Sequence, residues 1–309
     1  MLASRLIDSE SEDLMIFLHD GRKIGYAIYG NRSGFPVIYF HGFPGSRYEG
    51  KLLHEKLKNS PFKVYAIDRP GIGLSSPQKR RTLLSWAEDV LEFANLLKIK
   101  RFAILGISGG GPYALACTYQ IPSNRLIATL VVSGLGPMES GIKQMMPLLR
   151  AGLCLAKLSR TIFKLAYRLV FYSQFRTMKK SVKTIDKMIR GMSTTDQELF
   201  KTPEYKESFI LDNYAGYAQG PLGTAQDVEI YARDWGFKLE EIPEDKLVML
   251  IHGEADDIVP IEMGKYVADH IPNCESFFYE DGTHFTTAER YLKHLFVRLL
   301  NLFETDEVP

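Results

Sequence analysis

The sequence predicts an α/β protein with a doubly wound, mostly parallel sheet that begins with an antiparallel hairpin and carries a helical cap after its sixth strand. Short apolar runs alternate with helical stretches along most of the chain, as in proteins whose parallel strands are joined by crossover helices. One stretch of about a hundred residues breaks this alternation and contains no convincing strand. We therefore assign residues 1–136 and 237–309 to an α/β core and residues 137–236 to an inserted helical cap.

The strands are predicted from apolar runs of strand length. The first two runs are joined through Asp20-Gly21, a dipeptide typical of a tight hairpin turn. The later runs are continuous rather than alternating, as are strands buried on both faces of a parallel sheet. The eight runs lie at residues 14–19, 23–29, 36–40, 63–67, 102–107, 127–132, 247–251 and 276–279.

Helical stretches separate these strands. The clearest lies at residues 85–98, where Trp86, Val90, Phe93 and Leu97 recur every three or four residues and form one apolar stripe. Each stretch lies between two predicted strands or after the last one, as the helices of a doubly wound sheet do. The others are expected at residues 48–58, 112–120, 261–270 and 292–302.

The composition excludes several classes of protein. The chain has 309 residues, of which 45% are hydrophobic, enough to bury a large core. Its formal net charge of +1 gives no reason to expect a nucleic-acid partner. The first fifteen residues are charged and lack the apolar core of a secretory signal. Three widely separated cysteines are typical of a reducing compartment, so we expect a cytoplasmic protein.

The sharpest local signal is the pentapeptide Gly106-Ile107-Ser108-Gly109-Gly110, which follows a buried strand and runs into a helix. Glycines two residues before and two after a serine permit a very tight turn, because side chains would collide there. Such a turn lifts the hydroxyl above the carboxyl edge of the sheet and aims the first N–H groups of the helix at the group it attacks. A serine that only caps the helix is the alternative.

Together with this turn, four other segments resemble the α/β-hydrolase family, in the family's order and over nearly the whole chain. The resemblance implies a catalytic triad in the chain order Ser, acid, His, formed by Ser108, Asp256 and His284. It also implies an oxyanion hole made by the backbone N–H groups of Phe43 and Gly109, and a lid where the cap is inserted. The four segments are His41–Gly45, Asp68–Ser75, Gly253–Pro260 and Asp281–Phe285.

The choice of base also follows from the residues themselves. A serine hydroxyl is a poor nucleophile at neutral pH and needs an adjacent base, for which a neutral imidazole is suited. Of the seven histidines, His284 stands in a glycine-containing loop directly after a strand. His41 and His252 each end a strand before a glycine, and we expect them to tie loops together by hydrogen bonds. The other four are expected on the surface or in helix packing.

The base needs a carboxylate that fixes its tautomer and stabilises the imidazolium. Asp256 and Asp257 are adjacent, and the residues alone leave both open. The family's spacing to Val259-Pro260 favours Asp256. Asp281 is expected to stabilise its loop, and Asp68 to anchor the turn that follows it. No H-E-x-x-H, paired C-x-x-C or EF-hand pattern occurs, so we expect no metal and no other cofactor.

The predicted cap differs in charge from the rest of the chain. Residues 143–190 hold twelve basic residues and one acid, Asp186, a net charge of +11, whereas the remainder sums to −10. We expect an amphipathic lid helix with its apolar side on the pocket and its basic side in water. The alternatives are contact of the basic side with an anionic membrane, with a partner protein or with an anionic substrate. On one helix the basic stripe would consist of Arg150, Lys157, Arg160, Lys164 and Arg168.

These observations predict a serine hydrolase that cleaves a carboxylic ester, or a related acyl bond, of a small and partly apolar molecule through an acyl-enzyme. Serine at the tight turn argues against the family's epoxide hydrolases and dehalogenases, which use a carboxylate nucleophile. Amide, thioester, lipid and carbon–carbon cleavage stay open because the same triad serves each. A ligand-sensing protein with a hydrolase-like pocket and a membrane-docked lipid hydrolase are the two alternatives.

Overall fold

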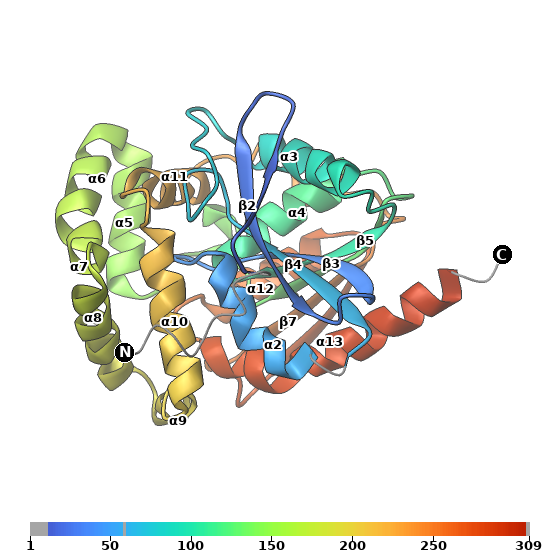
Figure 1. Cartoon of the computed structure of the whole chain (residues 1–309). Coiled ribbons are helices and arrows are strands. Elements are labelled where there is room, and N and C mark those ends of the chain that lie inside the picture. The colour runs from blue at the N-terminus through green and yellow to red at the C-terminus, as the bar shows by residue number, and fades with distance from the viewer. Residues whose placement is uncertain (1–11, 58–59, 307–309) are drawn as a thin grey trace.

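Eight strands form a single sheet at the centre of the protein (Figure 1). The computed structural model describes residues 12–57 and 60–306. The strands are β1 (Leu14–Phe17), β2 (Lys23–Gly30), β3 (Phe35–Phe40), β4 (Phe62–Ile67), β5 (Phe102–Ile107), β6 (Leu126–Val132), β7 (Val248–Gly253) and β8 (Cys274–Tyr279). Their order is β1-β2-β4-β3-β5-β6-β7-β8. Strand β2 runs antiparallel to both neighbours and every other neighbouring pair is parallel, which confirms the predicted fold class.

The predicted hairpin joins β1 to β2. Gly21 adopts φ +81°, a conformation that glycine reaches without steric cost. Across the turn the N–H of Leu18 donates to the carbonyl of Arg22 at 2.8 Å, and an oxygen of Asp20 accepts from the N–H of Arg22 at 2.9 Å.

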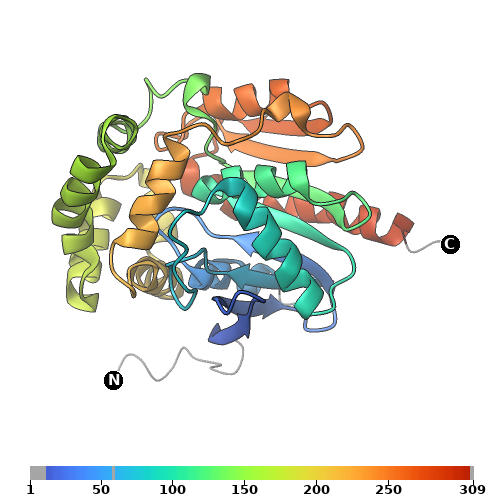
Figure 2. The ribbon, with the colours of Figure 1, turned by 90° about the horizontal axis from the view of Figure 1, so that it is seen from above.

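Helices cover both faces of the sheet (Figure 2). One face packs against α3 (Leu83–Leu96), α4 (Gly111–Gln120) and α12 (Ile261–His270). The other packs against α2 (Lys51–Leu57), which follows a short 3₁₀ turn at Arg47–Gly50, and against α13 (His284–Asp306). The last helix begins at His284 itself, eight residues earlier than the sequence predicts. The predicted end of the helix at residues 48–58 lies outside the described residues.

Between β6 and β7 the chain leaves the sheet and forms the cap, which lies at one end of the sheet (Figures 1 and 2). Residues 137–236 are all described and contain helices but no strand, so the helical insertion after the sixth strand is confirmed. Its helices are α5 (Pro147–Leu158), α6 (Arg160–Tyr167), η4 (Arg168–Tyr172), α7 (Ser173–Phe175), α8 (Met178–Gly191), α9 (Thr194–Leu199), α10 (Pro203–Gly216) and α11 (Leu222–Tyr231), with short 3₁₀ turns at Met138–Ser140 and Leu239–Glu241 outside them.

The expectation of one continuous lid helix over Arg150–Arg168 is wrong. Ser159 adopts extended dihedral angles (φ −151°, ψ 111°) between α5 and α6, and its hydroxyl accepts a hydrogen bond from the N–H of Ile162. Because an N-cap residue has non-helical dihedral angles, Ser159 caps α6 and cannot continue α5. The expected orientation is also wrong in part, because apolar side chains of α6 lie in solvent while Phe163 and Tyr167 are buried.

Two buried carboxylates of the cap fix it to the core. Asp227 of α11 accepts hydrogen bonds from Arg69 at 2.9 Å, from Tyr113 at 2.7 Å and from Arg81. The side chains of Arg69, Arg81 and Asp227 are all inaccessible to solvent. Asp212 of α10 accepts from the N–H of Ser46 at 2.6 Å.

Candidate active site

Ser108 stands on a tight turn between β5 and α4. Its φ is +51°, a left-handed conformation that is costly for a residue with a side chain. The turn closes because its flanks carry no side chain. A Cβ atom at Gly106 would lie 2.6 Å from the carbonyl oxygen of Gly110, and one at Gly110 would lie 2.2 Å from the carbonyl oxygen of Phe40. Both glycines are therefore required by close backbone approach, as the pentapeptide pattern predicts.

Three distant segments bring Ser108, His284 and Asp256 together. Nε2 of His284 lies 3.0 Å from Oγ of Ser108, and Nδ1 lies 2.8 Å from Oδ2 of Asp256. The second oxygen of Asp256 accepts from the N–H groups of Ile258 at 3.0 Å and Val259 at 2.8 Å. Because an ionised carboxylate only accepts, it holds the proton on Nδ1 and leaves Nε2 free to accept from the serine hydroxyl.

The electrostatics of this group favour an ionised acid and a basic imidazole. Burial alone would raise the pKa of Asp256, but the charge of His284 and hydrogen bonds from His252 and His284 lower it well below its usual range. Burial alone would lower the pKa of His284, but the charge and hydrogen bond of Asp256 raise it, with help from Asp196 and Asp257. The pKa of His284 therefore lies above its ordinary value of 6.5.

The competing residues are not members of this line of hydrogen bonds, although Nε2 of His252 lies 3.4 Å from Oδ2 of Asp256. Asp257 is exposed, and Asp281 binds Arg290 and Tyr291 on the surface. His41 and His252 make the loop hydrogen bonds expected of them: Nδ1 of His41 lies 2.9 Å from the carbonyl of Gly42, and Nε2 of His252 lies 2.9 Å from the carbonyl of Val259.

The two residues expected to supply an oxyanion hole lie side by side. A Cβ atom at Gly109 would lie 3.3 Å from the backbone nitrogen of Phe43 and 2.8 Å from its Cβ. A Cβ atom at Gly42 would lie 3.5 Å from Cβ of Ser108, so the loop that carries Phe43 runs directly beside the serine. The loop and the tight turn thus converge on one point.

Three residues outside the predicted triad and oxyanion hole hold this arrangement. Glu49 accepts from the N–H of Gly42 at 2.5 Å and from the hydroxyl of Tyr39 at 2.7 Å. Burial raises the pKa of Glu49. Arg69 donates to the carbonyl of Gly42 at 2.9 Å and also to that of His41.

The third residue is Tyr231 of the cap, whose hydroxyl donates to the carbonyl of Gly109 at 2.8 Å. For Arg69, the position beside Asp68 in the recognised turn was an available signal. The run of cap tyrosines Tyr214, Tyr217 and Tyr231 suggests hydroxyl contacts, although packing is the expected role. For Glu49 the chain offers no signal, because its partners come together only in the fold.

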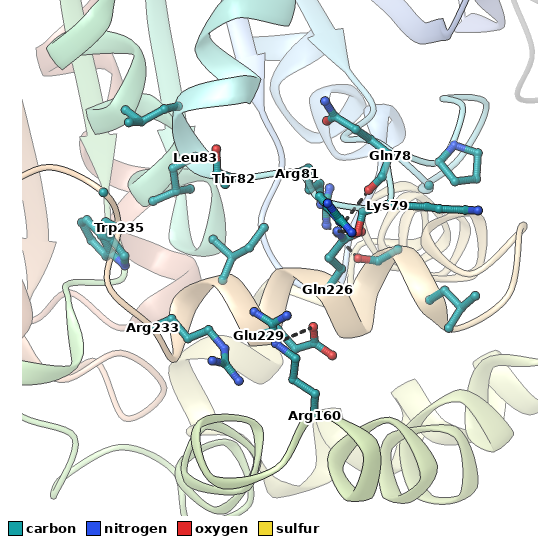
Figure 3. Close-up of a pocket in the computed structure, with 18 of the residues that line it drawn as sticks. Gln78, Lys79, Arg81, Thr82, Leu83, Arg160, Gln226, Glu229, Arg233 and Trp235 are labelled. Carbon is teal, nitrogen blue, oxygen red and sulfur yellow. Dashed lines mark hydrogen bonds and ion pairs between the residues drawn. The ribbon is translucent and has the colours of Figure 1, made fainter.

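A cavity of about 660 Å³ lies apart from these residues, at the junction of the core with α6 and α11 (Figure 3). Neither Ser108 nor His284 lines it. Figure 3 shows Arg160 reaching towards Glu229, to which it is 3.9 Å away. The other charged residues that line the cavity are Lys79, Arg80, Arg81, Lys164, Arg233 and Asp234.

Residues 36–291 match the model of a protein family described as having the alpha/beta hydrolase fold. The chain belongs to the α/β-hydrolase fold family. This confirms the resemblance found in the sequence, and the matched segment contains all five residues expected at the site.

Similarity to individual hydrolases and esterases extends over most of the chain. An uncharacterized hydrolase of Bacillus subtilis, YugF, is 23% identical over 280 residues, which cover 89% of this chain and 92% of that protein. A thermophilic esterase from Thermogutta terrifontis superposes with a TM-score of 0.67 at 19% identity, covering 96% of this chain and 99% of that one. The esterase RhEst1 from Rhodococcus sp. ECU1013 has a TM-score of 0.67 at 15% identity, covering 94% and 99%. At these identities the two structures show a shared fold.

Proposed function

We propose that this α/β hydrolase is a serine esterase that cleaves a carboxylic ester of a small, partly apolar molecule through an acyl-enzyme. The observation that carries the proposal is the unbroken line of hydrogen bonds from Ser108 through His284 to Asp256. Ser108 itself lies on a strained turn. Nucleophile, base and orienting acid in hydrogen-bond contact are the signature of an activated serine.

Each group has one role in the proposed reaction. As Oγ of Ser108 attacks the ester carbonyl, Nε2 of His284 takes its proton, and the carbonyl oxygen becomes an oxyanion held by the N–H groups of Phe43 and Gly109. The C–O bond then breaks, and His284 returns the proton to the departing alcohol. Water, deprotonated by His284, attacks the acyl-enzyme, and the carboxylic acid leaves as Ser108 regains its proton.

An apolar substrate suits the side chains around the oxyanion loop. The ring of Phe43 lies 6.1 Å from that of Tyr231 and 6.5 Å from that of Tyr167, both from the cap. Two similar structures are described as esterases, which supports the choice of an ester. We further propose that residues 137–236 form the cap unit on a core of residues 1–136 and 237–309. Three unpaired cysteines are consistent with a reducing compartment such as the cytoplasm.

The test is hydrolysis of a p-nitrophenyl ester by the wild-type protein and by Ser108→Ala. Loss of the nucleophile is expected to lower kcat by about 10⁴-fold or more. The matched control is Ser133→Ala, since Ser133 is also a buried serine with positive φ (+46°) at the end of a strand. It should leave turnover unchanged.

Labelling by a fluorophosphonate asks separately whether the hydroxyl is activated. Covalent labelling of the wild type and of Ser133→Ala, but not of Ser108→Ala, is expected. A wild-type protein that is neither labelled nor active on esters would contradict the proposal and leave the ligand-sensing interpretation in its place.

A further inference from the structure

The cap presents an unpartnered surface on the side that faces away from the sheet. Helices α6, α7 and α8 form the outermost column of the molecule in both views (Figures 1 and 2). The column carries two kinds of exposed side chain, which are apolar on the last residue of α5, on α6 and on η4, and cationic on α8. We call this surface the outer cap face and define it by Leu158, Ile162, Leu165, Leu169, Val170, Lys179, Lys183, Lys187 and Arg190.

The apolar half of the outer cap face is unusually exposed. Leu158 is 83% exposed, Ile162 59% and Leu165 60%. Ile162, Leu165 and Leu169 follow one another at spacings of three and four residues, which places them on one side of α6 and η4, while Leu158 is the last residue of α5. The opposite side holds Phe163 and Tyr167, which are buried in the core. These exposed apolar residues are therefore not the core-facing stripe of an ordinary surface helix.

The cationic half lies on α8. Lys179, Lys183, Lys187 and Arg190 are spaced by four, four and three residues and so form one stripe, opposite the buried Ile185. None of the four makes an ion pair with any acid in the parts of the chain that the structure describes. The single acid of the surrounding segment, Asp186, binds Lys206 at 2.7 Å, so it does not neutralise the stripe.

We propose that the outer cap face docks the protein onto a bilayer surface that carries anionic lipid headgroups. Exposed leucines beside a stripe of lysines are the composition of an interfacial element, in which apolar side chains enter the headgroup boundary and cations contact the phosphates. The inference does not depend on the proposed chemistry. It concerns peripheral contact, and among the described residues no helix is long and apolar enough to cross a bilayer.

The distribution of charge favours a bilayer over a second copy of the chain as the occupant of the outer cap face. Residues 143–190 carry +11 and the rest of the chain −10. Two outer cap faces brought together would repel each other, whereas an anionic surface attracts this face and repels the remainder. The same asymmetry orients the molecule with its cap towards the lipid.

The experiment measures sedimentation of the full-length protein with vesicles of phosphatidylcholine alone and of phosphatidylcholine mixed with phosphatidylserine. Binding to the mixed vesicles only, weakened when salt rises from about 0.1 to 1 M and the Debye length falls from about 10 to 3 Å, is the expected result. Equal binding to both vesicles, or none to either, would overturn the proposal.

Two variants test the two halves of the face separately. Replacing three lysines (Lys179→Gln, Lys183→Gln, Lys187→Gln) should weaken binding to mixed vesicles about 100-fold, at roughly fivefold per charge. The matched control removes three exposed charges elsewhere (Arg32→Gln, Lys100→Gln, Lys293→Gln) and should bind as the wild type does.

The apolar variant, Leu165→Gln with Leu169→Gln, should weaken binding at least about tenfold, because each leucine loses contact with the acyl boundary. Its control is Phe17→Gln, an exposed apolar residue on β1. Circular dichroism and the thermal midpoint identify any variant that has unfolded. Full binding by either folded variant would rule out this face as the docking surface. A wild-type dimer that the leucine variant converts to a monomer would show that the face binds another copy instead.

Discussion

Asp256 fixes both the proton position and the basicity of His284. Its Oδ2 lies against Nδ1, and its charge offsets the effect of burial on the imidazole pKa. A base accepts a proton only in its neutral form, so a raised pKa shifts the lower pH limit of activity upwards. We expect the acidic limb of kcat/KM to have its midpoint above 6.5.

Asp256→Asn tests this coupling. The variant loses the charge that raises the pKa of His284, so the acidic limb should move to lower pH. It also loses the acceptor that fixes the tautomer, so kcat should fall by about 10⁴-fold, as known for a triad of this kind. Ester hydrolysis from pH 5 to 9 measures both effects. Asp257→Asn, which alters the exposed neighbour, is the control, and an equal fall in kcat there would reverse the assignment of the acid.

In the proposed mechanism, Glu49 positions the loop that carries Phe43. Glu49→Leu removes the acceptor for the N–H of Gly42, so the loop should relax and kcat should fall about 100-fold, because small displacements are costly in a catalytic site. KM should change little, and Glu49→Gln, which keeps a side-chain acceptor, should restore much of the rate. If the two variants behave alike, or if KM carries the whole effect, the carboxylate has a different role.

Residues of the candidate site differ in whether their position there could be predicted from the sequence. Ser108, Asp256 and His284 could be predicted because each lies in a short segment whose glycines and flanking strand are contiguous with it. The sequence offers Tyr231 only as one of several cap tyrosines that could make hydroxyl contacts. Its partner could not be predicted, since Gly109 is 122 residues away. Glu49 lies only seven residues from Gly42, but its side chain must turn back under the loop to meet it.

At the scale of elements, strands were predicted better than helix ends. A strand buried on both faces must be apolar throughout, so β5 has the predicted limits, Phe102–Ile107. The limits of a helix depend on its capping residues and on tertiary contacts. Ser159 separates α5 from α6 because its hydroxyl caps the first turn of α6. Helix α13 extends back to His284 because Thr283 and Thr286 hydrogen-bond to each other across its first turn.

Helix α11 is held on the core by Asp227, and Asp227→Asn should be strongly destabilising. The change leaves Arg69 and Arg81 buried without a counter-charge, which costs about 3–5 kcal/mol in the free energy of unfolding. Urea denaturation measures it. The control, Asp281→Asn, removes a carboxylate from an exposed pair with Arg290 and should leave stability nearly unchanged. Equal stability of the two variants would mean that the buried cluster does not secure the cap.

On the scale of the whole molecule, the cap and the side chains on one face of the sheet share one hydrophobic cluster. Trp86 and Phe102 of the core belong to the same contiguous set of buried side chains as Phe163, Phe175 and Ile185 of the cap. A cap joined to the core in this way should not unfold by itself. The inserted segment could be recognised from its lack of strands, but this joint core could not, because apolar periodicity does not say which helix meets which.

We therefore expect a single cooperative thermal transition. Calorimetry should give a calorimetric enthalpy equal to the van't Hoff enthalpy, because core and cap lose their shared cluster together. The Asp227→Asn variant should lower the midpoint without splitting the transition. Two separated transitions in the wild type would contradict this and would make the cap an independent folding unit.

The hydrogen bond from Tyr231 to Gly109 has a consequence for engineering. The peptide next to Ser108 is held by a phenol that belongs to the cap, so we expect that the cap is not an interchangeable module. A chimera that received the lid of another hydrolase would need a donor at the same place to restore the turnover number, even if its new pocket accommodated the substrate well. Redesign of selectivity is therefore better confined to cap positions that face the bound molecule, with the end of α11 left intact.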